Sequence, residues 1–196
     1  MISLLRHGRT RSNADGLLLG RADPPLDSLG ERQARAAAIA LPEVTRVLSS
    51  PLRRAMQTAE VVAAQHGCGV EQADRLIELD YGDWDERPLR DVAAAEWAHW
   101  QASPHWSPPG GESLVAVGSR VRSLLEEIAE EAAHSHLVLV THVSPLKAAV
   151  AWALGVDDQA AWRMFVQPAS ISTIDTRNKQ PSLHSFNQVG HLVECW

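Results

Sequence analysis

The stretch ISLLRHG, residues 2–8, places a short apolar run directly before an arginine, a histidine and a glycine. The apolar run predicts a buried β-strand over residues 2–5. A buried strand holds rigidly whatever follows its carboxyl end, and ligands of open α/β sheets bind in the crevice beyond those ends. The guanidinium of Arg6 offers donors that suit phosphate oxygens, and Gly8 has no side chain to keep the backbone away from an anion. These residues fit either an anion site beside His7 or a histidine whose hydrogen bonds are satisfied within the turn after the strand, and the rest of the chain decides between the two.

Apolar runs and amphipathic stretches alternate along the rest of the chain. Buried strands are predicted over residues 46–49, 137–141 and 169–174. Helices are predicted over residues 28–41, 52–65 and 113–133, and a further helix has Pro145 in its first turn and ends at Leu154. Strands that alternate with helices are typical of a sheet covered on both faces. We expect a three-layer α/β/α sandwich with a mostly parallel central sheet.

Residues 79–111 interrupt the alternation with several tryptophans and prolines. A short helix is predicted from Asp91 to Gln101, and side chains three residues apart on a helix share a face, so Trp97 and Trp100 would point the same way. We interpret the interval as a lid insertion over the sheet edge of one domain that spans residues 1–196. Its aromatic side chains are expected to pack mainly against each other.

Composition limits the classes of protein that fit this chain. The 196 residues are 45% hydrophobic, enough for one substantial core. A net charge of -6 argues against a nucleic-acid binder or an anionic-membrane binder, because both need a basic surface. Cys68 and Cys195 lack metal-binding spacing, and the start of the sequence lacks a signal peptide or membrane span. We expect a cytoplasmic protein, and the apolar residues 193–196 leave a homodimer open.

Three further segments carry polar side chains in the pattern that an anion site needs. They are SSPLRRAMQT (residues 49–58), LIELDYG (residues 76–82) and VTHVS (residues 140–144), and two of them follow predicted strands. Together with Arg6, His7 and Gly8, they resemble the histidine phosphatase superfamily, the phosphoglycerate-mutase-like proteins, in order and spacing over almost the whole chain. The run PGGES at residues 109–113 is similar to that family's smaller phosphatases.

The resemblance implies a role for each residue of this constellation. His7 would be the nucleophile that forms a phosphohistidine, and a protonated His142 would join the arginines around the phosphoryl oxygens. Adjacent helical residues point about 100° apart, so only one of Arg53 and Arg54 can face the phosphate. The family pattern selects Arg54. The remaining roles are phosphate binding by Arg6, Asn13 and Val143, and proton donation to the leaving group by Glu78.

This arrangement would need no metal ion or cofactor, because the cationic side chains neutralise the phosphoryl oxygens. Its partner would be a small phosphate ester. The resembling mutases carry a long insertion between the proton donor and the second histidine, whereas the interval from Glu78 to His142 is short here. We therefore favour a phosphatase over a mutase, and over a domain that binds a phosphorylated ligand without turnover.

The substrate is not specified by these motifs. A second anionic group would be met by arginines of the early loops or the lid, and an apolar body by lid tryptophans. The candidate contacts are Arg9, Arg21, Trp84, Arg87 and Trp100. Related phosphatases act on sugar phosphates, phosphoglycerate derivatives or α-ribazole phosphate. Valine at position 143, where many relatives have glycine, slightly favours the acid-phosphatase-like and α-ribazole-phosphatase-like branch.

Overall fold

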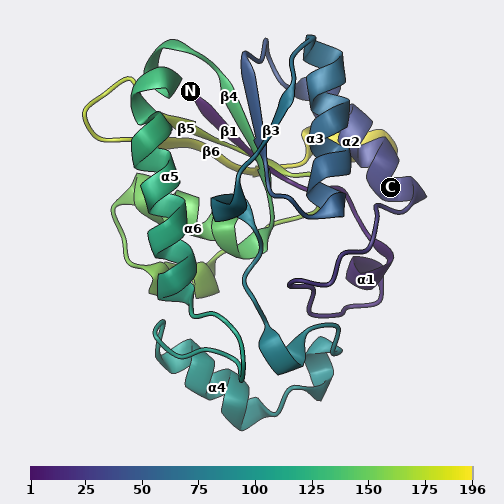
Figure 1. The fold of residues 1–196 in the computed structure, drawn as a ribbon, viewed down its shortest axis with the longest axis vertical. Coiled ribbons are helices and arrows are strands. Elements are labelled where there is room, and N and C mark those ends of the chain that lie inside the picture. Colours follow the sequence, from purple (N-terminus) through teal and green to yellow (C-terminus); the bar gives the residue numbers. More distant parts are fainter. Residues whose placement is uncertain (196) are drawn as a thin grey trace.

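A six-stranded sheet in the order β3-β2-β4-β1-β5-β6 organises the chain in the computed structural model, which describes residues 1–195 (Figure 1). The strands are β1 (Ile2–Arg6), β2 (Arg46–Ser49), β3 (Val70–Gln72), β4 (Leu137–Thr141), β5 (Ile171–Asp175) and β6 (Ser182–Gln188). The first four are parallel to each other, and β5 and β6 run antiparallel to their neighbours. The predicted mostly parallel sheet is confirmed.

Helices cover both faces of this sheet. One layer consists of α2 (Ser28–Ala40) and α3 (Arg53–His66), and the other of α5 (Leu114–His134) and α6 (Val143–Leu154) (Figure 1). Successive strand residues point to opposite faces. Leu4 therefore belongs to the core under α5 and α6, whereas Leu5 belongs to the core under α2 and α3. These two cores fix the three-layer sandwich.

The remaining elements are short. They are α1 (Arg11–Ala14), α4 (Ala94–Ala102) and the 3-10 helices η1 (Asp74–Leu76), η2 (Gly82–Trp84), η3 (Leu89–Asp91), η4 (Asp158–Arg163) and η5 (Gly190–Cys195). The helix predicted from Asp91 begins at Ala94, because residues 89–91 form η3. The sequence analysis missed β3 and β6, since neither has the buried apolar run by which the other strands were found.

The lid, residues 79–111, contains η2, η3 and α4. Trp97 and Trp100 line a cavity with Val143 and Ser144, so α4 lies beyond the carboxyl end of β4 and not along either edge strand (Figure 1). The aromatic side chains pack closely, with ring centroids of Trp84 and Trp106 only 5.4 Å apart. The lid is thus positioned to close over whatever occupies the ends of β1 and β4.

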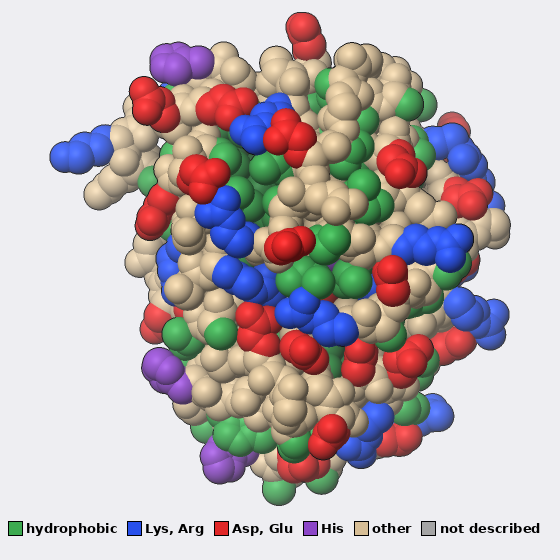
Figure 2. Space-filling model, in the orientation of Figure 1, with side chains coloured by type: hydrophobic (Ala, Val, Ile, Leu, Met, Phe, Trp, Pro, Cys, Tyr) green, Lys and Arg blue, Asp and Glu red, His purple; other side chains and the backbone are tan. Residues whose placement is uncertain are grey.

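The surface and the end of the described chain add two facts. No helix within residues 1–195 has both the length and the apolar character needed to cross a membrane. Basic and acidic side chains are interspersed on the face shown in Figure 2. Of the apolar residues 193–196, Cys195 is buried with Ala169 and Val193 is exposed, while Trp196 lies outside the described residues.

Candidate active site

The register of β1 against β4 brings two histidines together. Arg6 pairs with Thr141 in this parallel ladder, and the backbone N–H of His7 donates to the Thr141 carbonyl at 3.0 Å. His7 and His142 therefore leave the sheet side by side, with ring centroids 5.0 Å apart. Both side chains are buried. Two strands separated by 130 residues in the chain thus fix one pair of imidazoles.

Arg54 joins these imidazoles from the first turn of α3. Its Nε–H lies 3.3 Å from His7 Nε2 and 3.2 Å from His142 Nδ1, so one proton is shared between two acceptors. The other guanidinium nitrogens donate to the carbonyls of Ala22 at 2.7 Å and Gly20 at 2.9 Å. Arg54 is fully buried, whereas Arg53 is exposed. The arginine that the family pattern selected is the one that reaches the histidines.

The hydrogen bonds of His7 define its protonation state. Because Nε2 accepts from Arg54, the ring proton is on Nδ1, which donates to the Gly8 carbonyl at 2.7 Å. Burial lowers the pKa of His7 well below its ordinary value, and the charges of Arg54 and Arg6 lower it further. His7 is therefore neutral at pH 7. Charged phosphoryl oxygens are stronger hydrogen-bond acceptors than an imidazole nitrogen. A bound phosphoryl group would therefore take the Arg54 Nε–H and leave the lone pair of His7 Nε2 free to react.

His142 is also neutral in this structure, and its expected protonated state beside a phosphoryl group stays a prediction. Its Nδ1 accepts from Arg54, and Nε2 lies 2.7 Å from Ser50 Oγ, to which it donates. Burial lowers the pKa of His142 well below its ordinary value, and Arg54 adds to this effect. Only a bound anion would offset that desolvation. Ser50 was missed by the sequence analysis, although it follows β2 as His7 follows β1.

Arg6 supplies a second positive charge, which is partly buried. Its Nη1 donates to the Val166 carbonyl at 2.6 Å, while its Nε is buried without a hydrogen-bond partner. Burial lowers the pKa of Arg6 to about 10. Within residues 1–195, neither Arg6 nor Arg54 forms an ion pair, and Glu78 acts on both only through space. Two cations without a contacting carboxylate, one buried and one partly buried, favour the binding of an anion between them.

Glu78 is buried at the start of α6. One carboxylate oxygen accepts from the backbone N–H groups of Leu79 at 2.7 Å and Ser144 at 3.1 Å, and the other accepts from Val143 at 3.0 Å. The carboxylate thus caps a helix whose N-cap residue, His142, makes no side-chain cap. The Val143 amide was assigned to phosphate. In this structure a phosphoryl oxygen would have to displace Glu78 to reach it.

An inner cavity of about 200 Å³ brings most of the predicted set to one place. Its lining includes Arg6, His7, Asn13, Leu17, Leu18, Leu19, Glu78, Tyr81, Leu89 and Val143. Asn13 uses its side-chain oxygen to accept from Thr10, which caps α1. Its amide group can therefore still donate into the cavity. The cavity combines a neutral histidine, cationic and amide donors, and a carboxylate, which are the groups that transfer of a phosphoryl group requires.

Comparison with known proteins agrees with this geometry. Residues 2–189 match the sequence pattern of the Histidine phosphatase superfamily (branch 1). The chain belongs to the histidine phosphatase superfamily. Phosphoserine phosphatase 1 of Hydrogenobacter thermophilus is 32% identical, with 98% of this chain and 94% of that protein aligned. The adenosylcobalamin/α-ribazole phosphatase of Escherichia coli is also 32% identical, with 97% of both chains aligned.

Other relatives of this histidine phosphatase widen the range of named activities. A probable phosphoglycerate mutase of Proteus mirabilis is 33% identical, with 90% of this chain and 85% of that protein aligned. Among solved structures, a mycobacterial glucosyl-3-phosphoglycerate phosphatase superposes with a TM-score of 0.85 at 29% identity, covering 96% of this chain and 98% of that one. The shared fold is thus closely kept while the named substrates differ.

Gly8 of this histidine phosphatase has a different purpose from the one expected. A Cβ there would lie 2.4 Å from the Gly30 carbonyl oxygen, so the glycine permits the loop after β1 to pack on the start of α2. Its N–H does not face an anion, because it donates to Thr58 Oγ1 at 3.1 Å. Thr58 lies one turn after Arg54 and was not singled out, although residues four apart share a helix face.

A carboxylate of the lid supports the loop that holds Arg54. Asp85 accepts from three successive backbone N–H groups, those of Gly20 at 2.7 Å, Arg21 at 2.9 Å and Ala22 at 2.8 Å. The carbonyls of Gly20 and Ala22 are the ones that receive the Arg54 guanidinium. A continuous set of hydrogen bonds therefore runs from the lid to His7.

The three arginines predicted to contact the substrate lie in different parts of the structure. Arg9 forms an ion pair with Asp27 and lines a wider outer cavity of about 670 Å³ that also reaches Arg6 and Asn13. The other two are engaged within the lid region. Arg21 lies 3.8 Å from Asp80 and 3.5 Å from Glu112, and Arg87 is partly exposed and donates to the Asp91 carbonyl. Of the three, only Arg9 borders a described cavity next to the site.

The two candidate tryptophans also differ. Trp84 is 1% exposed and packs against Trp97, Trp100 and Trp106, so it belongs to the lid core and has no free face for a substrate. Trp100 is likewise buried, yet it lines the cavity between the lid and α6. The sequence showed which tryptophans share a helix face, but it did not show which side of the tryptophan cluster borders the cavity.

Proposed function

We propose that this protein hydrolyses small phosphomonoesters through a phosphohistidine on His7 Nε2. The observation that carries the proposal is a buried, neutral His7 whose Nε2 faces Arg54 and lies in one cavity with Arg6. In the first step the Nε2–P bond forms and the ester P–O bond breaks, and Glu78 in its protonated form gives its proton to the leaving oxygen. In the second step water attacks phosphorus, the P–N bond breaks, and Glu78 takes the proton from that water.

Arg6 and Arg54 would balance the negative charge of the phosphoryl group in both steps. The phosphoryl oxygens would lie between Arg6 and Arg54, and the Nε–H of Arg6, which has no hydrogen-bond partner within residues 1–195, would gain an acceptor. The phosphatases among the relatives support hydrolysis, and the mutase name of another relative keeps transfer to a second hydroxyl as the alternative. A homodimer and a cytoplasmic location stay predictions from the sequence.

Hydrolysis and transfer are separated by one assay. With EDTA present, the protein is expected to release inorganic phosphate from 4-nitrophenyl phosphate and from a panel comprising phosphoserine, α-ribazole phosphate and 3-phosphoglycerate. Phosphate is measured together with the phosphorylated products formed when ethanol or glycerol is added. Transfer between the hydroxyls of phosphoglycerate without phosphate release would establish a mutase instead. Binding of esters with neither outcome would overturn both.

Replacing Glu78 by glutamine is expected to separate the two half-reactions. Loss of a general acid or base costs on the order of 10² to 10⁴-fold, so hydrolysis of phosphoserine should fall within that range. With 4-nitrophenyl phosphate the leaving group departs without a proton, and only the attack of water is slowed. We therefore expect a rapid burst of nitrophenol, one per protein molecule, followed by slow turnover.

Glu71→Gln is the control for this substitution. Glu71 is exposed on β3 and pairs with Arg46, away from the site, so its replacement should leave turnover unchanged. The burst is measured by stopped-flow absorbance, and the phosphorylated protein by mass spectrometry. If Glu78→Gln slows the first turnover of 4-nitrophenyl phosphate as much as the steady state, Glu78 does not serve the second step.

A further inference from the structure

A second cavity, here called the aromatic cavity, opens from the inner cavity under the lid. It has a volume of about 170 Å³. It shares with the inner cavity the four lining residues Leu18, Tyr81, Leu89 and Val143. A group attached to a phosphoryl group at His7 therefore meets this space next. Two cavities border the inner one, the wider outer cavity that reaches Arg6 and Asn13 and the aromatic cavity, and only the aromatic cavity is lined by indole rings.

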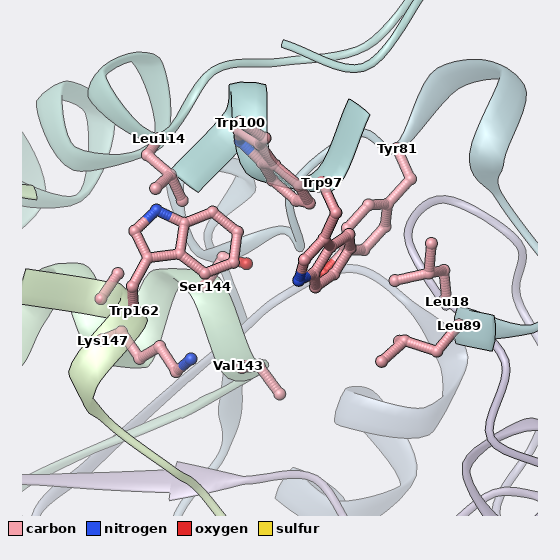
Figure 3. Close-up of a pocket in the computed structure, with 11 residues that line it drawn as sticks. Leu18, Tyr81, Leu89, Trp97, Trp100, Leu114, Val143, Ser144, Lys147 and Trp162 are labelled. Carbon is pink, nitrogen blue, oxygen red and sulfur yellow. The ribbon is translucent and has the colours of Figure 1, made fainter. Parts of the chain in front are cut away.

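The walls of the aromatic cavity are mostly apolar. Indole rings and aliphatic side chains form them, and they include Trp97, Trp100, Leu114, Ala161 and Trp162 (Figure 3). Tyr81 and Ser144 add two hydroxyl-bearing side chains to these walls. An apolar cavity of about 150 Å³ accommodates benzene, so this one has room for a single ring. A sugar, whose hydroxyls would each need a partner, is poorly matched to such walls.

One charged group enters this apolar space. Lys147 lies four residues after Val143 and three after Ser144, so all three share a face of α6. Its amine turns toward the space between the indoles (Figure 3). Burial lowers the pKa of Lys147, and Glu78 opposes this effect through space. Within residues 1–195, Lys147 forms no ion pair and no side-chain hydrogen bond.

The choice of lysine at this position is unusual for the chain. Of its 18 basic residues only Lys147 and Lys179 are lysines, and the others are arginines. An ammonium group is a compact point charge, which one carboxylate can satisfy, whereas a phosphate dianion needs several donors. Four residues of helix rise about 6 Å, so Lys147 is set about one ring length along α6 from Val143, which lines both cavities.

We propose that Lys147 binds a carboxylate on the leaving group, and that the preferred substrates are phosphomonoesters of compact aromatic or apolar alcohols that carry this carboxylate. The carboxylate lies about one ring length from the ester oxygen. This inference rests on the proposed hydrolysis at His7. The lid indoles pack on the ring, and Lys147 gains the acceptor that the protein itself does not provide.

Two matched esters test this assignment. The carboxyl group of 4-carboxyphenyl phosphate is charged, whereas 4-carbamoylphenyl phosphate has a neutral group of similar size and a slightly better leaving group. Hydrogen bonds to charged groups favour binding by about 10 to 150-fold, so kcat/KM should favour the carboxylate ester by roughly 30-fold. In Lys147→Met the ratio is expected to fall to about one. Lys179→Met, in an exposed loop, should keep the native ratio.

The outcomes separate this inference from the proposed function. A native ratio near one overturns the inference, while hydrolysis of both esters would leave the role of His7 intact. No hydrolysis of either ester by a protein that releases phosphate from phosphoserine would also overturn the inference, whereas no release from any ester of the panel would overturn the proposed function. A high ratio that persists in Lys147→Met, or an equal loss on both esters, would mean that Lys147 does not recognise the carboxylate.

A binding measurement on the native protein avoids any doubt about the fold of the variant. Reductive methylation of the two lysines is followed by mass spectrometry of the peptides, with 4-carboxyphenylphosphonate or its carbamoyl counterpart present as a non-hydrolysable probe. We expect the carboxylate probe to protect Lys147 and leave Lys179 reactive. Equal protection of Lys147 by both probes would overturn its role in recognising charge.

Discussion

Replacing His7 by alanine is expected to lower phosphate release from every ester on the order of 10⁴-fold or more, as removal of a covalent nucleophile does in other enzymes. The reason is geometric. His7 Nε2 is directed by the Nδ1–H bond to the Gly8 carbonyl, and its lone pair is kept free of a proton by burial and by two arginines. Water has no comparable position in line with a bound phosphoryl group.

The measurement follows phosphate release together with the protein-bound phosphoryl group. Native protein quenched in alkali during turnover should carry one phosphoryl group on the peptide that contains His7, and acid should remove it. His7→Ala should carry none, while phosphate esters still bind through Arg6 and Arg54. His105→Ala, at an exposed histidine of the lid, serves as the control and should behave as the native protein. Phosphorylation of a different residue, or turnover that survives in His7→Ala, would contradict the mechanism.

The second large effect is expected for Arg54→Lys, which should lose about 10² to 10³-fold in kcat, the usual cost of one transition-state donor. A lysine has no planar fork of donors, so one ammonium cannot hold the Gly20 and Ala22 carbonyls and also reach both imidazoles. The exposed neighbour makes a matched control, because Arg53→Lys changes the same residue type one position away. It should retain native kcat.

The pH profile gives Arg54 a signature that a purely structural role would not produce. After burial, the charge of Arg54 is the largest cause that lowers the pKa of both His7 and His142. In Arg54→Met that charge is gone, so both pKa values rise toward 6.5 from below. Protonated His7 cannot attack, and the residual kcat/KM should therefore decline at a higher pH than in the native protein. An unchanged acid limb would show that Arg54 does not tune the nucleophile.

The sequence was sufficient for those parts of the fold that have strong local patterns. Strands β1 and β4 are mostly apolar, β2 has Val47 and Leu48 at its centre, and the helices between the strands have one apolar face, so the sandwich could be predicted. The edge strands did not follow, because β3 has only three residues and β6 carries Ser, His, Asn and Gln. Their pairing depends on neighbours in the sheet, which no local pattern describes.

The residues of the site can also be divided into those that a local sequence pattern predicts and those that it does not. Side chains that follow strands, such as His7 and His142, could be predicted because the sheet aligns the ends of its strands. The neutral state of His142 and the purpose of Gly8 could not, since they depend on burial and on the Gly30 backbone packed against the loop. The place of Lys147 in the aromatic cavity could not be predicted either, because it depends on how the lid tryptophans pack around that cavity.

The contact of Asp85 with the loop of residues 20–22 has a consequence for how this enzyme can diversify. If the lid only covered the substrate, recombination could exchange it between relatives without affecting the rest of the domain. Here the lid also carries the carboxylate that shapes the loop under Arg54. A lid taken from a relative that lacks an acidic side chain at this position would change the substrate specificity. It would also lower the rate of the reaction, because the loop under Arg54 would lose its support. A new substrate range can therefore be acquired through the lid only if the lid keeps Asp85, although Asp85 lines neither the inner cavity nor the aromatic cavity.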